Sequence, residues 1–481
     1  MQDSLQADAE FDARGVQTLG GLGTCLSQGA GSGCSAADEG EFDPVAYINT
    51  PRWQHVSLGL ERISLLMEKL GNPQDSLKFV HVAGTNGKGS TCAYIASILQ
   101  CAGYKTGLFT SPYIEKFEER IRVDGCNISA CDLRAITLRV RSAAQEVEAQ
   151  LSEHPTEFEL MSAVAFCYFK QCECDIVVLE VGLGGRLDST NVIKNPEVCV
   201  IARLGLDHTA ILGSTIEEIA AEKAGIIKPG CSVLSYPQEQ GAQDVVQAAA
   251  AAAGAQCAYP DFDALECGAI SVETNQYKIY RNFSYKGAQY KTSLLGTYQP
   301  KNAALAIETV SELQKRGWNI SGNAIEQGIE NTRWPGRFEV FAPTQNSPWT
   351  VVDGGHNPQG IDALVDTLAD VFLNKKPVII LSVLADKNHH EMISSLARVA
   401  KAFVAVEAPS VRALDAVSLA NELQEVCKKQ GREGVSITTA QNFSEAYCKA
   451  KDIAQKDGLV VFSGSLYSVA LAKEAILANS I

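Results

Sequence analysis

The sequence has no surplus of positive charge, and this shortage limits the partners that the protein can bind. Its 481 residues include 41 Lys and Arg against 56 Asp and Glu, which gives a net charge of −15. General binding to DNA, RNA or anionic lipid depends on a basic surface that releases counterions. We therefore predict no nucleic-acid partner and no membrane partner, and we expect anionic ligands to be held by a few local cations.

Long hydrophobic runs are also missing. No stretch of 18 apolar residues occurs, so we predict no transmembrane span. Residues 1–43 are acidic, rich in Gly and Ser and without periodicity, and Arg14 is their single basic residue. This composition excludes a signal or transit peptide, and we interpret the segment as a disordered extension.

Cysteine is not scarce, but its arrangement lacks the pattern of a disulfide framework or a zinc site. The 15 cysteines are odd in number and scattered through apolar segments, which favours a reducing cytoplasm. Cys172 and Cys174 are separated by one residue rather than two, and no second pair lies nearby. We therefore predict a cytoplasmic protein, and we expect Cys172 and Cys174 to be free or buried thiols.

A glycine-rich stretch between a predicted strand and a predicted helix carries the clearest functional signal. Leu77–Ala83 is a short apolar run typical of a buried strand, and Ser90–Ala102 has helical spacing that stops at Gly103. The loop between them offers backbone N–H groups and the mobile charge of Lys88 to an anion. Its residues are Gly84, Thr85, Asn86, Gly87, Lys88, Gly89 and Ser90.

The spacing of this loop departs from the usual phosphate-binding pattern. Gly84 and Gly87 are three residues apart, and Gly89 separates Lys88 from Ser90. The alternative is a tight strand-to-helix turn without a ligand. Because the lysine and both flanking elements are those that a phosphate site needs, we favour binding of a nucleoside triphosphate.

Alternating strands and helices after this loop predict an α/β fold. We expect a doubly wound parallel sheet of the P-loop type in residues 44–335 and a smaller Rossmann-like domain in residues 336–481. Residues 275–295 are expected to form hairpin strands appended to the first sheet. Thr215 and Glu218 predict a capping box at the start of a helix. The other predicted strands are Thr106–Phe109, Asp175–Val181, Val198–Ala202, Thr350–Asp353, Val378–Leu384, Ala402–Glu407 and Leu459–Phe462.

Four polar side chains follow or end separate strands of the first domain. They are Lys88, Ser111, Glu180 and His208. Because ligands of open parallel sheets bind beyond the carboxyl ends of the strands, we expect these side chains to gather at one edge. Ser, Glu and His around a phosphate are plausible ligands of Mg²⁺, although a histidine also leaves room for Mn²⁺. Taken singly, each has an ordinary surface or turn role as its alternative.

Other polar residues stay ambiguous at this level. Lys223 near the end of a helix is best explained by favourable placement against the helix C-terminus. Asp353 and His356 follow a predicted strand of the second domain. Two interpretations are equally supported: these residues contact the nucleotide, or they form an ordinary turn before a helix that starts at Pro358.

A set of motifs in this order resembles the folylpolyglutamate synthase family, including its bacterial bifunctional members that are also dihydrofolate synthases, within the Mur ligase superfamily. The resemblance runs from about Tyr47 to near the C-terminus. The motifs are Gly84–Ser90, Ser111-Pro112, Glu180–Asn191, Leu206–His208, Glu222–Ile226, Pro335–Phe338 and Asp353–Pro358.

The resemblance implies an ATP-dependent ligase that joins L-glutamate to dihydropteroate or to the terminal glutamate of a reduced folate, through an acyl phosphate. It implies that the glycine loop holds the phosphates of ATP, that Ser111, Glu180 and His208 surround Mg²⁺, and that a carbamylated Lys223 helps to bind a second Mg²⁺. It also implies ATP contacts from Asn302, Arg337, Asp353 and His356, and a pterin-binding loop around Asp188. We expect a monomer whose partners are these small molecules.

Two departures and two rival functions remain. Tyr113 stands where the family commonly has histidine, and Gly355 where it commonly has alanine, which puts substrate contacts in doubt.

A cell-wall Mur ligase usually carries a sizeable domain ahead of the phosphate loop, and here only about 40 residues with predicted structure precede Gly84. A nucleotide-binding regulatory protein without ligase chemistry would have no use for Glu180, His208 and Lys223.

Overall fold

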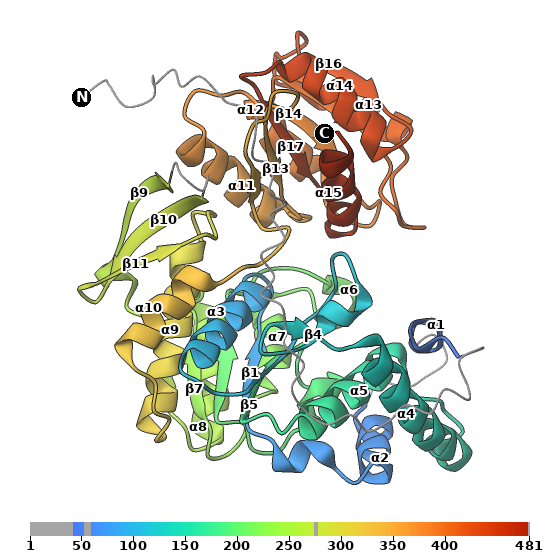
Figure 1. The fold of residues 1–481 in the computed structure, drawn as a ribbon, viewed down its shortest axis with the longest axis vertical. Coiled ribbons are helices and arrows are strands. Elements are labelled where there is room, and N and C mark those ends of the chain that lie inside the picture. The colour runs from blue at the N-terminus through green and yellow to red at the C-terminus, as the bar shows by residue number, and fades with distance from the viewer. Residues whose placement is uncertain (1–41, 52–58, 274–277, 480–481) are drawn as a thin grey trace. The chain divides into compact units, whose positions relative to one another are not determined.

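The computed structural model describes residues 42–51, 59–273 and 278–479 (Figure 1). Residues 1–41, and with them nearly all of the predicted disordered extension, lie outside this part of the chain. Asp43–Ile481 forms one compact unit. Its first helix is α1 (Pro44–Ile48), where the Asp43 side chain accepts hydrogen bonds from the N–H groups of Val45 and Ala46.

An eight-stranded sheet with the order β4-β3-β2-β5-β1-β6-β7-β8 forms the first half of this unit. Its neighbours pair in parallel from β2 to β8, and β3 and β4 form an antiparallel edge. The strands are β1 (Phe79–Ala83), β2 (Thr106–Phe109), β3 (Ile121–Val123), β4 (Cys126–Asn127), β5 (Ile176–Glu180), β6 (Val198–Ile201), β7 (Ser232–Ser235) and β8 (Cys257–Ala258). The predicted strands at β1, β2, β5 and β6 are confirmed within two residues.

Helices cover both faces of this sheet, because alternate strand residues point to opposite sides. Phe79 packs with α2 (Glu61–Lys69), α4 (Ala130–Leu151) and α5 (Glu157–Gln171), whereas Val80 packs with α3 (Lys88–Cys101), α9 (Gln299–Lys315) and α10 (Gly322–Asn331). Two more helices, α7 (Ile216–Ala224) and α8 (Gln240–Ala252), cover β6 and β7. The predicted doubly wound architecture is confirmed, as is the capping box of Thr215 and Glu218 on α7.

The prediction that hairpin strands extend the first sheet is wrong. The strands β9 (Leu265–Glu273), β10 (Lys278–Tyr285) and β11 (Ala288–Thr292) form a separate antiparallel sheet. The edges of the first sheet are the two-residue strands β4 and β8, which offer little backbone for a further strand to pair with. Instead, the small sheet buries Phe283 and Tyr285 against the core beneath α3 and α9.

The C-terminal part of the chain, drawn in orange and red in Figure 1, forms a six-stranded sheet of order β12-β13-β17-β14-β15-β16. Only β12 is antiparallel to its neighbour. The strands are β12 (Glu339–Phe341), β13 (Trp349–Val352), β14 (Val378–Leu381), β15 (Ala402–Ala405), β16 (Ser436–Thr439) and β17 (Leu459–Ser463). All four predicted strands are present, whereas β12 and β16 were not predicted.

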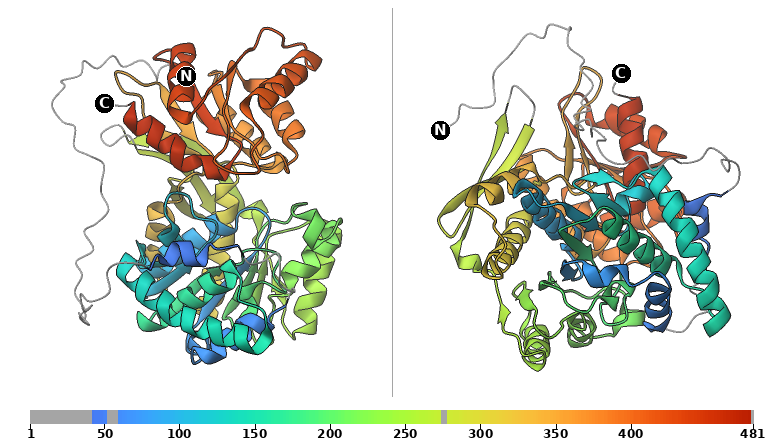
Figure 2. Two further views of the ribbon diagram at one scale, coloured as in Figure 1. Left: turned by 90° about the vertical axis from the view of Figure 1, so that its right-hand side faces the viewer. Right: turned by 60° about the horizontal axis from the view of Figure 1, so that its bottom comes forward.

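Helices also cover both faces of this second sheet, as the two further views in Figure 2 show. One face carries α11 (Pro358–Val371), α12 (His389–Val399) and α13 (Ala416–Lys429), and the other carries α14 (Phe443–Ala454) and α15 (Val469–Ala478). The predicted boundary near residue 335 stays a prediction, since Asp43–Ile481 is compact as a whole. Among the described residues, no helix combines the length and apolar character that a membrane crossing requires.

Candidate active site

The glycine loop connects the central strand β1 to α3, and the chain after β6 supports it. The N–H groups of Thr85 and Asn86 donate to the carbonyl of Arg203, at 2.9 and 3.0 Å. Gly84 has a φ of 155°, and a Cβ there would lie 2.7 Å from the Cβ of Ala202, so the loop can follow this path only with glycine. The loop is therefore held rigidly against the end of β6.

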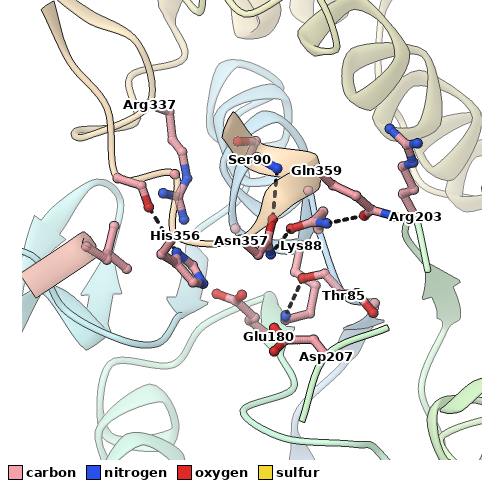
Figure 3. Close-up of a pocket in the computed structure, with 18 of the residues that line it drawn as sticks. Thr85, Lys88, Ser90, Glu180, Arg203, Asp207, Arg337, His356, Asn357 and Gln359 are labelled. Carbon is pink, nitrogen blue, oxygen red and sulfur yellow. Dashed lines mark hydrogen bonds between the residues drawn. The ribbon is translucent and has the colours of Figure 1, made fainter. Parts of the chain in front are cut away.

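Lys88 opens α3, whose N-cap is Gly87 and which no side chain caps. The Nζ atom of Lys88 lies 3.4 Å from the carbonyl of Thr85, and Figure 3 shows this side chain beside Glu180. The first N–H groups of a helix lack partners within it, and together with the dipole they attract an anion. Local geometry here thus fits the phosphate site that the sequence predicts.

Glu180 ends β5 and is buried, with an exposed fraction of 4%. Its Oε2 atom accepts a hydrogen bond from the N–H of Ser111 at 3.2 Å. Burial raises the pKa of this carboxyl, while the charge of Lys88 opposes the rise. The carboxylate and the Ser111 residue after β2 therefore meet at one sheet edge, as strand-end reasoning predicted.

His208 caps the one-turn helix α6 (Thr209–Leu212) with a left-handed backbone, φ 51°. Burial lowers the pKa of its imidazole below the usual 6.5, although Asp207 opposes this effect. The neutral ring that results at neutral pH is the form that can ligate a metal. His208 lines the same pocket as Lys88 and Glu180.

Lys223, on the last turn of α7, is buried with 5% of its surface exposed. Burial, aided by the positive charge of Lys88, lowers the pKa of its amine to about 7. Within the described part of the chain, no hydrogen-bond acceptor or carboxylate pairs with its Nζ. If Lys223 only stabilised the C-terminus of α7, its amine would be expected to lie in water. Its burial in the pocket therefore weakens the helix-terminus interpretation that the sequence favoured.

The second sheet contributes Asp353 and His356 from the loop after β13. Asp353 is buried, and its two oxygens accept hydrogen bonds from the N–H groups of Phe338, at 2.9 Å, and Gly355, at 2.8 Å. His356 places Nδ1 2.9 Å from the carbonyl of Gly354, which leaves Nε2 free to accept. Burial lowers the pKa of His356 to about 4, so the ring is neutral.

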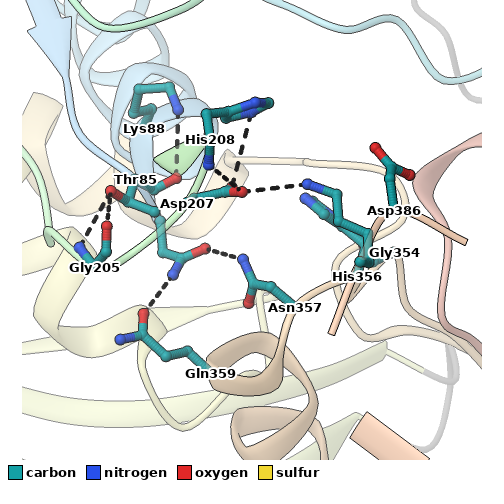
Figure 4. Close-up of polar contacts among 12 residues, drawn as sticks. Thr85, Lys88, Gly205, Asp207, His208, Gly354, His356, Asn357, Gln359 and Asp386 are labelled. Atoms are coloured by element: carbon teal, nitrogen blue, oxygen red, sulfur yellow. Dashed lines mark hydrogen bonds and ion pairs between the residues drawn. The ribbon is translucent and has the colours of Figure 1, made fainter. Parts of the chain in front are cut away.

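Direct contacts join the two sheets across the pocket (Figure 4). Asn86 of the glycine loop donates to Gln359 at 2.7 Å and accepts from Asn357 at 3.3 Å. Lys387, after β14, makes an ion pair of 3.2 Å with Asp207. These contacts place Asn357 and the start of α11 against the phosphate loop, and the loop after β14 against the loop after β6.

A pocket of about 250 Å³ contains nearly every residue that the sequence predicts for the site. Those on its lining are Gly84, Thr85, Asn86, Gly87, Lys88, Gly89, Ser90, Ser111, Glu180, His208, Lys223, Asn302, Arg337, Asp353 and His356.

Asp188 is the exception, since it does not line the pocket. Its buried carboxylate accepts hydrogen bonds from the N–H groups of Leu183, at 2.9 Å, and Thr190, at 3.0 Å. It thereby fixes the loop after β5, and its predicted contact with a pterin stays a prediction.

Sequence reasoning missed several residues of this pocket. Arg203 lies two residues after β6 and Tyr236 directly follows β7, so the strand-end rule applied to every strand would have found them. Gln299 does not line the pocket itself, but from helix α9 it donates to Ser90 at 3.2 Å and accepts from Asn302 at 3.2 Å. No local pattern marks such a contact.

No group of three His, Cys, Asp or Glu side chains suited to a metal occurs among the described residues, and Cys172 and Cys174 are free thiols. A magnesium ion prefers oxygen donors and keeps several waters, so a carboxylate, a hydroxyl and substrate phosphates suffice to hold it. Glu180 and Ser111 offer such donors in the pocket.

Comparisons with known proteins agree with this geometry. Residues 82–310 match the Mur ligase middle domain, and residues 336–466 match the Mur ligase glutamate ligase domain. A dihydrofolate synthase/folylpolyglutamate synthase of Bacillus subtilis (strain 168) is 40% identical over 370 residues, which cover 74% of this chain and 84% of the relative.

Two solved structures extend the likeness to the fold. Folylpolyglutamate synthase of Mycobacterium tuberculosis complexed with ADP superposes with a TM-score of 0.79 at 29% identity, covering 90% of this chain and 98% of the other. An E. coli structure in complex with DHPP and ADP gives a TM-score of 0.75 at 29% identity, covering 90% and 97%.

Proposed function

This chain belongs to the folylpolyglutamate synthase/dihydrofolate synthase family of Mur ligases and is an ATP-dependent ligase, and we propose that it adds L-glutamate both to reduced folates and to dihydropteroate. One observation carries the proposal. A single pocket combines a glycine loop and Lys88 with Glu180, His208 and Lys223, and the second sheet adds Arg337 to it.

The reaction needs a carboxylate to become an acyl donor. The folate or pteroate carboxylate attacks the γ-phosphorus of ATP, which forms an acyl phosphate and releases ADP. The amine of glutamate then attacks the acyl carbon, and phosphate leaves as the amide bond forms. The main task of the protein is to position these groups and to offset charge on the moving phosphoryl group.

We assign roles to the chain's own residues on this basis. Lys88 and the N–H groups at the start of α3 bind the phosphates. Asn302, whose amide lies against Gly87, contacts ATP from the side of the glycine loop. Arg337, Asp353 and His356 contact ATP from the opposite wall. Contacts between the two sheets, such as that of Asn86 with Gln359, exclude water that would hydrolyse the acyl phosphate.

Ser111, Glu180 and His208 fit a magnesium site by their donor chemistry, with Mn²⁺ as an alternative because of the histidine. Once bound, the metal would neutralise negative charge on the transferring phosphoryl group. We propose that a second metal ion binds beside a carbamylated Lys223. The amine of Lys223, with a pKa of about 7, is largely neutral at slightly basic pH. It can therefore add to CO₂, which forms a carbamate and releases a proton.

We further propose that the protein acts as a monomer in the cytoplasm on small molecules. Its net charge of −15 supports the absence of a nucleic-acid partner.

The test is phosphate release from ATP in the presence of L-glutamate, with either tetrahydrofolate or dihydropteroate as acceptor. We expect turnover with both acceptors and a loss of about 100-fold or more in Lys88→Ala, since that variant removes charge stabilisation from the transition state. The exposed Lys376→Ala serves as the control and should behave as the wild type. Turnover of ATP that does not depend on an acceptor and glutamate would contradict ligase function, and near-normal ligation by Lys88→Ala would contradict the assigned site.

A further inference from the structure

Arg120 lies at the margin of the candidate active site. It ends a 3-10 helix (Phe117–Arg120) just before β3, and its carbonyl accepts the N–H of Thr110 at 3.1 Å, at the end of β2. Ser111 and Pro112, the next residues along the chain, line the pocket. The backbone of Arg120 therefore lies beside the sheet edge at which the pocket residues gather.

The guanidinium of Arg120 has no counter-ion in the part of the chain that the structure describes. Nη1 lies 3.2 Å from the sulfur of Met161, and the buried Nε has no hydrogen-bond partner. The group stacks over the ring of Tyr113, 4.9 Å from its centroid. Burial lowers the pKa of Arg120, yet an arginine stays protonated at physiological pH, so a desolvated positive charge remains unpaired.

Nearby carboxylates are engaged elsewhere. Glu119 accepts hydrogen bonds from the N–H groups of Ile114, Glu115 and Lys116. Glu115 pairs with Lys473 at 2.6 Å. Because leaving a partly buried charge without a partner is unfavourable, a cation that no described carboxylate pairs with is suited to bind an anion of the substrate.

Two exposed tyrosines indicate where that anion enters. Tyr113 follows Pro112 and Tyr467 follows Leu466, and both of these neighbours line the pocket from opposite walls. The exposed fractions of Tyr113 and Tyr467 are 37% and 47%. Tyr113 and Tyr467 act to raise the pKa of Arg120, against the larger effect of burial, which lowers it. The guanidinium lies against the rings of Tyr113 and Phe117, 4.9 and 5.5 Å from their centroids, and Pro112 beside Tyr113 lines the pocket.

We propose that Arg120 binds a carboxylate of the substrate that does not react, and that Tyr113 holds the guanidinium in place by stacking. We favour the α-carboxylate of the folate's terminal glutamate as the group that Arg120 binds. The incoming L-glutamate is the other molecule that could supply a carboxylate to this site. The planar fork of an arginine can hold a carboxylate through two parallel hydrogen bonds. This inference rests on the proposed function and names a specificity residue for it.

The test combines variants with an altered substrate. Arg120→Gln removes the charge, and Arg120→Lys keeps it without the fork. Arg122→Gln is the matched control, since Arg122 lies two residues away and its Nε already donates to Asn127 at 3.0 Å. Each enzyme is assayed with tetrahydrofolate and with its α-carboxamide, with KM and kcat measured for the acceptor, L-glutamate and ATP, and Tm recorded.

We expect Arg120→Gln to raise KM for tetrahydrofolate about tenfold or more, the size of one lost charge-assisted hydrogen bond, while Arg122→Gln changes it less than twofold. The carboxamide should lose affinity for the wild type but not further for Arg120→Gln, because both changes remove the same contact. Arg120→Lys should recover part of the loss. If Arg120→Gln instead raises KM for L-glutamate, with tetrahydrofolate and with its α-carboxamide alike, then Arg120 binds the carboxylate of the incoming L-glutamate.

Other outcomes overturn the proposal. Unchanged KM values for the acceptor and for L-glutamate in Arg120→Gln would overturn it. An equal loss of kcat/KM for all substrates, including ATP, together with a lower Tm, would also overturn it, because that is the result of a structural role. A wild-type enzyme that releases no phosphate with tetrahydrofolate would overturn the proposed function, and the inference with it.

Discussion

Lys387 makes an ion pair with Asp207 at 3.2 Å, and this pair joins the two sheets beside His208. The side chains of both partners are largely buried, with exposed fractions of 18% and 19%. The positive charge of Lys387 helps to lower the pKa of Asp207 below its usual value. A charge pair in this position controls how the loop that carries His208 meets the second sheet.

We expect Lys387→Gln to lower kcat/KM for ATP by about tenfold, because it leaves the Asp207 carboxylate without its partner. The adjacent pair of Arg412 and Asp386, at 2.8 Å, has exposed fractions of 49% and 48%. Arg412→Gln should therefore change kcat/KM less than twofold, since exposed pairs contribute little. Steady-state kinetics of both variants check this prediction, and equal effects would contradict it.

Lys223→Ala should lose most activity, because the buried amine is the group that would become a carbamate. Small carboxylates such as acetate should restore part of it by occupying the vacated space. Phosphate release with increasing acetate is the measurement. Lys88→Ala, which removes a cation rather than a metal ligand, should show no such rescue. Full activity of Lys223→Ala without acetate would eliminate the carbamate.

Glu197 should stabilise the fold in a pH-dependent way. Its carboxylate contacts Arg316 at 2.5 Å and Lys78 at 3.1 Å, and these partners lower its pKa below 4.5 despite the opposing effect of burial. A lowered folded-state pKa contributes stability that is present above the unfolded value and lost as pH falls through the folded one. Urea unfolding at pH 7 should give Glu197→Gln a deficit of about 1.5–3 kcal/mol.

That deficit should shrink as the pH is lowered below 4.5, because the wild-type carboxylate takes up a proton only below this ordinary value. Glu425→Gln, at an exposed position on α13, should match the wild type at each pH. A deficit for Glu197→Gln that stays constant across this range would mean that packing, not charge, links these residues.

Gly328 allows α10 to approach α3. A Cβ at this position would lie 2.4 Å from the Cα of Ile98, which is backbone and cannot turn away. Gly328→Ala should therefore lower stability by about 1–3 kcal/mol, measured as Tm and by urea unfolding. Gly322→Ala, on the same helix, meets nothing within 4 Å and should be neutral or slightly stabilising, because alanine favours the helix. Equal Tm values for the two variants would contradict this packing argument.

Much of the fold follows from short-range patterns. The apolar run before Gly84 became β1, and Thr215 with Glu218 formed the expected capping box on α7. The same patterns could not say that β9, β10 and β11 form a sheet of their own, since pairing depends on which edges remain free after the first sheet has formed. They also missed β16, a short strand whose residues are only partly buried.

The amino-acid order determined which side chains stand at strand ends, and parallel strands bring their carboxyl ends to one edge; Lys88, Glu180 and His208 were predictable for that reason. Tertiary structure alone decided the electrostatic state of these groups. Burial brings the pKa of Lys223 to about 7, and among the described residues the buried Nε of Arg120 has no hydrogen-bond partner. Desolvation and pairing depend on neighbours that are distant in the chain, so no local pattern encodes them.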